Sequence, residues 1–280
     1  MPHAAALDHL EHVARLTHGR DREGLDATLV EVLRLVTQAE AVTLWEVVPD
    51  EGGERALRRV SIGPGDALQG PPAWRHAGEL PALAALPGLT AALQAGETLV
   101  LPDGAGQRVL VPLQTETQRR LVLDLVLAGA ASESIRRVAA GFARVYVNVI
   151  NLLEASERDA LTGLLNRKSF DDTFYKATRP AQQARSAADG ERRTTALRHW
   201  LGVIDVDHFK EAVNDRYGHL IGDEVLLLMA RLLRQTIRHD DRLYRFGGEE
   251  FVALVRADDA AAAAAAFERL HARVEADPLP

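Results

Sequence analysis

The chain contains no cysteine among its 280 residues. This absence excludes disulfides, thiol catalysis and cysteine-ligated metals, and it fits the reducing cytoplasm. No apolar run is long enough to span a membrane, and the first residues show no signal-peptide pattern. The net charge of −7 argues against a nucleic-acid-binding surface. We therefore expect a cytoplasmic protein with no membrane span and no nucleic-acid partner.

The N-terminal half shows the periodicity of helices followed by strands. The chain is 47% apolar and long enough for two domains. Helical spacing covers residues 5–17 and 24–39, and a Gly- and Pro-rich loop covers 63–78. Strands are predicted over 41–48, 55–61, 97–102, 107–114 and 119–127, with a helix over 80–95. This order resembles a GAF-type sensor domain over residues 1–131, and a PAS domain is the rival interpretation.

Three side chains of this half are candidates for lining a ligand pocket: Trp45, Trp74 and His76. The alternative is that Trp45 is a core residue on its strand and Trp74 a lid over the core. A lone histidine rarely ligates a metal or haem, so His76 adds little to the ligand interpretation.

An apolar seam connects the two halves of the chain. Between residues 132 and 156, apolar residues recur at steps of three and four: Ile135, Val138, Phe142, Val145, Val149 and Leu152. This a/d pattern of about three heptads predicts a dimeric signalling helix. The alternative is a helix that packs on its own sensor domain.

The most informative segment is residues 245–251, with the sequence RFGGEEF. Two glycines between apolar flanks predict a β-hairpin whose two-residue turn is Gly247-Gly248. A turn without side chains lets a phosphorylated group lie on its backbone, and Glu249 and Glu250 could hold a divalent cation against that group. The alternative is a tight hairpin with a solvated acidic pair.

Residues 201–210, with the sequence LGVIDVDHFK, predict an apolar strand that ends in carboxylates. Strand alternation places Asp205 and Asp207 on one face. A carboxylate at the end of a buried strand is costly unless it is paired or binds a metal. Lys210 follows this strand directly.

Downstream of this strand, Asn214 and Asp223 carry groups that could hydrogen-bond a guanine edge, an amide on one side and a carboxylate on the other. The alternative for both residues is helix capping, with a helix starting at Asp223.

A further motif, DALTGLLNR at residues 159–167, combines a turn at Thr162-Gly163 with a helix start near Asn166 or Arg167. In this order the four motifs resemble the GGDEF family of diguanylate cyclases, from residue 159 to residue 280. The expected fold is α/β (α+β): a GAF-like antiparallel-sheet sensor over 1–131, a signalling helix over 132–158, and a GGDEF domain over 159–280 whose central sheet is flanked by helices.

The resemblance implies that two GTP molecules are condensed into cyclic di-GMP, with Mg²⁺ or Mn²⁺, at the interface of a homodimer. It implies a metal site formed by Asp205, the carbonyl of Val206, Glu249 and Glu250. It implies catalytic roles for Glu249, Glu250 and Lys210. It implies substrate binding by Asn214, Asp223, His219, Gly247 and Gly248.

Residues 238–241, RHDD, match the R-x-x-D inhibitory site of the family at the usual offset. The resemblance implies that Arg238 and Asp241 bind cyclic di-GMP as a feedback inhibitor. The alternative is an i,i+3 ion pair at a helix end.

Two features depart from the family pattern. Three residues separate Lys210 from Asn214, one more than usual, which would rotate a regular helix by about 100° unless a local bulge absorbs it. Family domains also continue beyond the point where this chain stops, so we expect a partial domain with an exposed sheet edge. A polar stretch over residues 177–199 is expected to be a surface insertion.

We therefore expect a diguanylate cyclase that is regulated by its N-terminal domain and by its product. The alternative is a catalytically silent GGDEF domain that senses GTP or cyclic di-GMP. Intact carboxylates favour the first hypothesis, whereas the additional residue before Asn214 and the missing C-terminal part of the domain favour the second.

Overall fold

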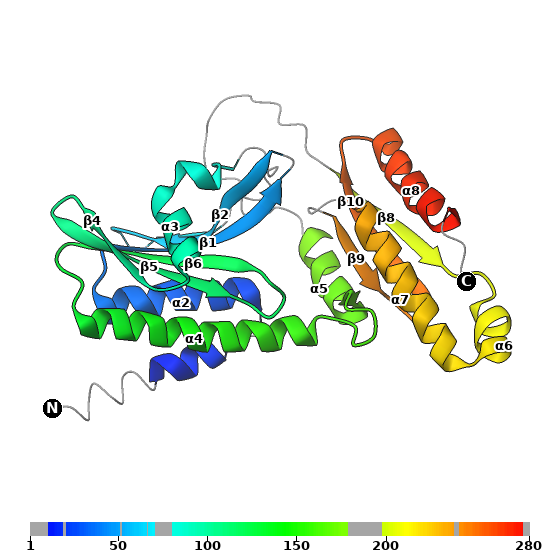
Figure 1. The fold of residues 1–280 in the computed structure, drawn as a ribbon, viewed down its shortest axis with the longest axis horizontal. Coiled ribbons are helices and arrows are strands. Elements are labelled where there is room, and N and C mark those ends of the chain that lie inside the picture. Colours follow the sequence, from blue (N-terminus) through cyan, green and yellow to red (C-terminus); the bar gives the residue numbers. More distant parts are fainter. Residues whose placement is uncertain are drawn as a thin grey trace. The chain divides into compact units, whose positions relative to one another are not determined.

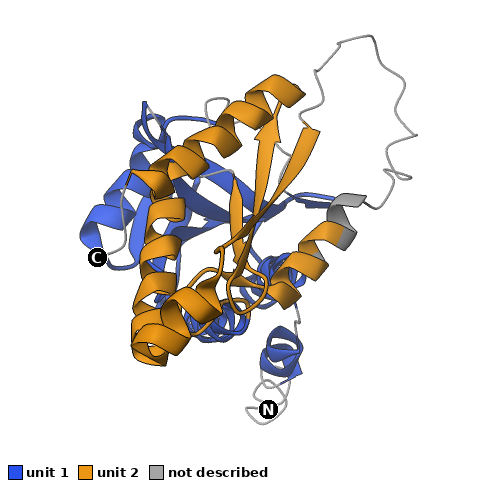
Figure 2. Cartoon of the chain, turned by 90° about the vertical axis from the view of Figure 1, so that its right-hand side faces the viewer, with its two compact units in different colours: residues 1–156 blue, residues 157–280 orange. Residues whose placement is uncertain are grey.

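The computed structural model describes most of the chain, and all structural statements below concern the described residues. These are residues 11–18, 21–50, 52–65, 67–70, 80–178, 198–237 and 241–276. The chain divides into two compact units, Met1–Ser156 and Glu157–Pro280 (Figure 2). The candidate residues Trp74, His76 and Arg238 lie outside the described ranges, as does most of the expected insertion.

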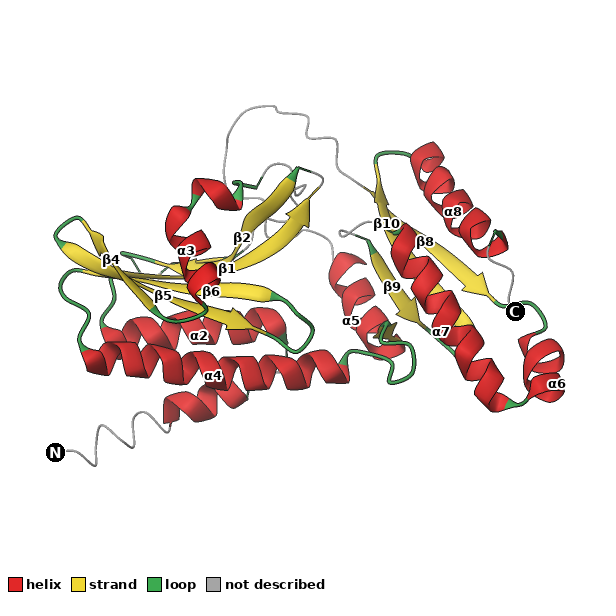
Figure 3. Cartoon of the chain, in the orientation of Figure 1, coloured by secondary structure: helices red, strands yellow, loops and turns green. Residues whose placement is uncertain are grey.

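The first unit is built on a six-stranded antiparallel sheet with the order β3-β2-β1-β6-β5-β4 (Figures 1 and 3). The strands are β1 (Ala41–Asp50), β2 (Gly53–Ile62), β3 (Leu68–Gln69), β4 (Leu99–Asp103), β5 (Gly106–Gln114) and β6 (Arg120–Leu127). The five predicted strands are confirmed to within a few residues at each end. The sequence did not reveal the short β3.

Helices cover both faces of this sheet. A helix over residues 11–17, α2 (Arg22–Thr37) and α4 (Glu133–Ser156) pack on one face and form the larger core with alternate residues of β1, β5 and β6. A 3₁₀ turn at Leu83–Ala85 and α3 (Pro87–Ala95) form a smaller core on the other face. Trp45 packs in this smaller core, which supports its interpretation as a core residue.

Most of the predicted seam of α4 faces its own domain. Phe142 is buried, and Ile135, Val138, Val145 and Val149 pack partly buried against the larger core. Leu152 is 72% exposed. By length and composition α4 could also cross a membrane, which the sequence did not lead us to expect. The core helix of a soluble protein can have the same length and composition.

The second unit is built on a four-stranded sheet with the order β7-β9-β10-β8. Its strands are β7 (Leu165–Asn166), β8 (Arg198–Asp205), β9 (Arg242–Arg245) and β10 (Glu250–Ala257). Its helices are α5 (Arg167–Thr178), α6 (Asp215–Tyr217), α7 (His219–Thr236) and α8 (Ala260–Glu275), with a π-helical segment at Phe209–Asn214. One core forms between the sheet and helices α7 and α8, and a smaller one lies beside α5.

Strand β8 lies at an edge of this sheet within the described residues. Leu201 is 47% exposed and Val203 is 68% exposed, whereas Val252 and Leu254, their partners on β10, are buried. The expectation that Asp205 ends a buried strand was therefore wrong. Burial of a strand depends on which elements flank it, and alternation along one strand does not reveal this.

Candidate nucleotide and metal site

Asp205 and Glu250 lie directly opposite each other on two adjacent antiparallel strands. Asp205 is the last residue of β8, Glu250 is the first of β10, and the register pairs them directly. Side chains of directly paired residues point to the same face, with Cβ atoms about 4.5–5.5 Å apart. Two exposed like charges at this spacing repel each other, and a divalent cation between them would convert the repulsion into coordination.

The loop between β9 and β10 is wider than the predicted two-residue turn. It spans Phe246 to Glu249, and the N–H groups of Phe246 and Gly247 both donate to the carbonyl of Glu250, at 2.8 and 3.2 Å. Neither glycine of the loop has a positive φ, so the tight mirror-image turn expected for Gly-Gly does not form. Two donors on one carbonyl close a broader loop instead.

The two glycines have different surroundings. A Cβ on Gly247 would lie 2.3 Å from Oε2 of Glu250, whereas a Cβ on Gly248 would meet nothing within 4 Å. The carboxylate of Glu250 therefore lies against the backbone at Gly247. Gly248 is exposed and leaves its backbone open to a ligand.

Arg245 connects this loop to the first turn of the unit. Its Nη2 and Nε donate to the carbonyl of Gly248 at 2.8 and 3.2 Å, and its Nη1 donates to Oδ1 of Asp159 at 3.0 Å. The sequence placed Arg245 in a motif but gave it no role. The signal for this role was an arginine close in sequence to two glycines. Glycines leave their backbone carbonyls uncovered, so a guanidinium can donate to them.

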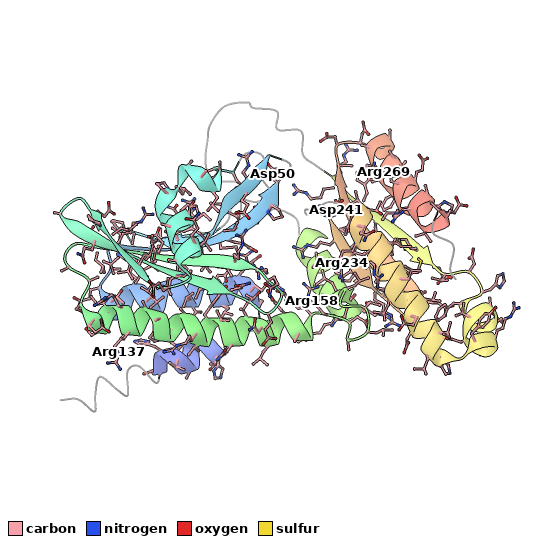
Figure 4. The ribbon with its side chains drawn as sticks, in the orientation of Figure 1. Asp50, Arg137, Arg158, Arg234, Asp241 and Arg269 are labelled. Atoms are coloured by element: carbon pink, nitrogen blue, oxygen red, sulfur yellow. The ribbon has the colours of Figure 1, made fainter. Side chains whose placement is uncertain are left out.

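The turn at residues 159–164 is tightly hydrogen-bonded. Asp159 Oδ1 accepts from the N–H and hydroxyl of Thr162 at 2.8 and 2.7 Å. Arg158 donates to the carbonyl of Gly163 at 2.7 Å, and Arg234 to that of Thr162 at 3.2 Å (Figure 4). Partial burial alone would raise the pKa of Asp159, but the bonds from Thr162 and Arg245 lower it below its usual value. Asp159 is therefore an anion that fixes Arg245.

The additional residue before Asn214 is absorbed by the π-helical segment Phe209–Asn214, the local bulge that the sequence required. The N–H of Asp215 donates to the carbonyl of Lys210, five residues earlier, instead of four as in an α-helix. A π-turn accommodates one additional residue without rotating the flanking chain by a full residue step. Lys210 is exposed on this segment.

Asn214 lies against the start of α7. A Cβ on Gly222 would lie 2.0 Å from Oδ1 of Asn214, so the glycine leaves room for that side chain. Asp223 is the next residue, and His219 and Asp223 stand one helical turn apart, both exposed. The capping alternatives are wrong: Asn214 makes no side-chain cap hydrogen bond, and Asp223 is inside α7.

The remaining candidate residues are Val206, Asp241 and Glu249. The carbonyl of Val206 accepts the N–H of Phe209 at 3.3 Å, which leaves one lone pair for a metal. Asp241 accepts the backbone N–H of Arg256 at 3.1 Å at the start of β9 (Figure 4). Within the described ranges no group of three or more His, Cys, Asp or Glu side chains could hold a metal. Asp205 and Glu250 therefore form a pair, and Glu249 lies in the adjoining loop.

Residues 156–280 match the family model described as "Diguanylate cyclase, GGDEF domain". Diguanylate cyclase DgcP of Pseudomonas aeruginosa is 41% identical over 121 residues, which cover 43% of this chain and 16% of that protein. Diguanylate cyclase DgcM of Escherichia coli K12 is 44% identical over 104 residues, covering 37% and 22%. The family model therefore matches the second unit of this chain.

The chain spans less than a third of the length of these curated relatives. A solved structure of the coiled coil and GGDEF domain of DgcB from Caulobacter crescentus, in complex with c-di-GMP, is 26% identical. That likeness covers 51% of this chain and 69% of the DgcB chain, with a TM-score of 0.42.

Proposed function

We propose that the protein is a diguanylate cyclase that condenses two GTP into cyclic di-GMP and releases pyrophosphate. The observation that carries this proposal is the direct pairing of Asp205 with Glu250 beside an open Gly-Gly loop. Each of the two steps forms a bond from a 3′-oxygen to an α-phosphorus and breaks the bond to pyrophosphate. The proton of the 3′-hydroxyl passes to solvent as its oxygen attacks.

One set of residues would bind the metal and the phosphates, and a second set would bind the guanine base. Asp205, the Val206 carbonyl, Glu249 and Glu250 would hold Mg²⁺ or Mn²⁺, which would activate the hydroxyl and neutralise the phosphates. Lys210 would add positive charge at the triphosphate, and the open backbone of Gly248 would let the phosphates approach. Asn214, His219 and Asp223 would bind the guanine side of the nucleotide.

Regulation and assembly belong to the same proposal. One domain holds one GTP, so the cyclic product requires two domains, and we infer a homodimer. The first unit, with its central antiparallel sheet and helices on both faces, would act as a GAF-like sensor. Arg238 and Asp241 would bind the product as an inhibitor. A cytoplasmic location gives access to GTP.

The test is mass spectrometry of GTP and Mg²⁺ incubated with the purified chain and with two isosteric variants. Asp205→Asn and Glu250→Gln keep shape and remove charge, so both should lose cyclic di-GMP formation while circular dichroism is unchanged. Glu249→Ala should also abolish turnover. Wild-type rates in all three variants would overturn the proposal.

A catalytically silent domain that binds GTP or cyclic di-GMP is the second candidate. The observation that favours it is that the described carboxylates form a pair and not a three-residue metal cluster. Calorimetric binding of GTP or cyclic di-GMP without any turnover, in the dimer and with either metal, would establish this second function.

A further inference from the structure

The last turn of α4 is held by polar groups of the turn between β5 and β6. The N–H of Glu116 donates to Oδ1 of Asn151 at 3.1 Å. The hydroxyl of Thr117 donates to Glu154, and Nη1 of Arg119 donates to Oε1 of Glu154 at 2.6 Å. Arg22, at the start of α2, adds an ion pair to Glu154 at 3.5 Å. We call these contacts the clasp.

Apolar packing contributes less to the same turn, where Leu153 is the one side chain of residues 151–156 that packs on the larger core. Upstream, α4 buries Ala139, Phe142, Ala143, Tyr146 and Ile150 in the larger core. Beyond Ile150, Leu152 is 72% exposed and Leu153 is half-buried, while Glu154 is only 1% exposed. The carboxylate is thus the buried group of the last turn. A buried charge is tolerated only while its partners stay in place, so this attachment depends on the clasp.

The turn that forms the clasp is itself well defined. The N–H of Thr115 donates to the carbonyl of Arg119 at 3.0 Å, and the N–H of Gln118 donates to that of Thr115 at 3.0 Å. The hydroxyl of Thr115 accepts the N–H of Arg119 at 3.2 Å. Because the turn is held by its own hydrogen bonds, the contact that can open is the one between the turn and α4.

A chain of partly buried ion pairs continues from the clasp into the sheet. Nε of Arg119 donates to Glu46 on β1 at 2.7 Å, and Glu46 pairs with Arg59 on β2 at 3.5 Å. Arg59 pairs with Asp26 on α2 at 2.9 Å, and Asp26 accepts the hydroxyl of Tyr146 on α4 at 2.7 Å. These groups polarise one another, so a change at one pair alters the others.

This chain also reaches the opposite face of the sheet. Glu46 follows Trp45, where the register of β1 with β2 shifts, and successive strand residues point to opposite faces. On the α3 side, Nε1 of Trp45 donates to Asp124 at 3.2 Å, and Arg108 holds Asp124 through two bonds at 2.8 and 2.6 Å. A displacement of Trp45 would therefore also shift Glu46, its neighbour in β1.

We propose that the clasp is a local, releasable contact through which the first unit sets the position of the end of α4. The unit boundary falls directly after Ser156, two residues beyond Glu154. Opening the clasp frees residues 151–156 and leaves the helix before Ile150 packed. The proposal concerns only the first unit and does not require cyclase activity.

Hydrogen exchange of the full-length chain, followed by mass spectrometry, tests this proposal. Glu154→Gln keeps the shape but weakens the bonds from Arg119 and Arg22, and exchange of amides 151–156 should accelerate at least tenfold. Exchange of residues 139–146 should stay within about twofold. The matched control is Arg55→Gln, which disturbs a partly buried Arg–Asp pair of the same sheet that lies outside the chain of ion pairs described above; it should leave exchange of residues 151–156 unchanged.

Two further variants keep the test decisive. Thr117→Val removes one donor to Glu154 and should give a smaller acceleration of the same amides, even if Glu154→Gln folds poorly. Because the chain has no cysteine, Leu153→Cys supplies a single thiol whose maleimide reaction should be faster when combined with Thr117→Val. Unchanged exchange in residues 151–156, or a uniform increase across residues 21–156, would overturn the proposal.

Discussion

Arg245 donates two hydrogen bonds to the carbonyl of Gly248, at 2.8 Å from Nη2 and 3.2 Å from Nε. Its remaining nitrogen pairs with Asp159, which is itself fixed by Thr162. The guanidinium thus holds the exposed glycine of the signature loop against the first turn of the second unit. This arrangement makes Arg245 a positioning residue for the proposed site.

Replacing Arg245 should slow catalysis without unfolding the domain. Arg245→Gln loses charge-assisted bonds worth about 1.5–3 kcal/mol each, so kcat for cyclic di-GMP should fall at least tenfold. Arg245→Lys should be intermediate, because a lysine pairs with Asp159 but lacks the fork. The control Arg242→Gln removes a guanidinium that donates to the Thr173 hydroxyl, and it should retain near-normal rates. Equal kinetics in Arg245→Gln and wild type would refute the positioning role.

The two glycines of the loop should respond differently to alanine. A Cβ at Gly247 would lie 2.3 Å from the Glu250 carboxylate and must displace it, so Gly247→Ala should lower kcat strongly. Gly248→Ala has open space and no positive φ, so the free protein should tolerate it. Steady-state kinetics with Mg²⁺ and a thermal melt of each variant measure this difference. A larger loss of thermal stability in Gly248→Ala would contradict the arrangement described here.

These cases show what the sequence could predict of the site. The motifs predicted strands β8, β9 and β10, the closeness of Asp205 to Glu250 and the need for a bulge before Asn214. They did not give the width of the glycine loop, because it depends on two N–H groups sharing the Glu250 carbonyl. They also did not give the exposure of β8, because an edge position is set by strand order and not by alternation.

Gly222 and Asn214 should be energetically coupled. Gly222→Ala forces its Cβ to within 2.0 Å of Oδ1 of Asn214, so it should rotate that amide and raise the KM for GTP. Asn214→Ala should raise the KM by a similar factor. In the double variant there is no amide left to displace, so the two effects should not add. Additive effects in the cycle would show that Gly222 acts independently of Asn214.

The ion pairs of the first unit should make its stability depend on acid pH. Burial alone would raise the pKa of Glu46, but Arg119 and Arg59 lower it below its usual value of 4.5. A depressed folded pKa means that the unfolded state binds the proton first as the pH falls. The stabilisation is therefore present above about pH 4.5 and is lost as the pH falls through the lower folded pKa.

Hydrogen exchange of β1 at several pH values checks this dependence. Glu46→Gln should accelerate exchange at pH 7, where the carboxylate stabilises the fold, and should make the rise toward low pH shallower after correction for intrinsic exchange. An identical pH profile in the variant would show that Glu46 does not contribute to the acid dependence.

The exposed end of the α4 seam offers the sharpest test of the proposed dimer. Val145 and Val149 pack partly on their own core, so charges there would also damage the first unit. Leu152 is 72% exposed, so Leu152→Asp should leave the monomer folded. If the seam pairs two chains, burying like charges across it costs several kcal/mol and should shift the protein to monomer in light scattering. Cyclase activity should fall in parallel and recover at high protein concentration.

Ser134→Asp, an exposed charge outside the seam, is the control and should remain dimeric. A Leu152→Asp protein that stays dimeric and active would place dimerisation elsewhere on the molecule.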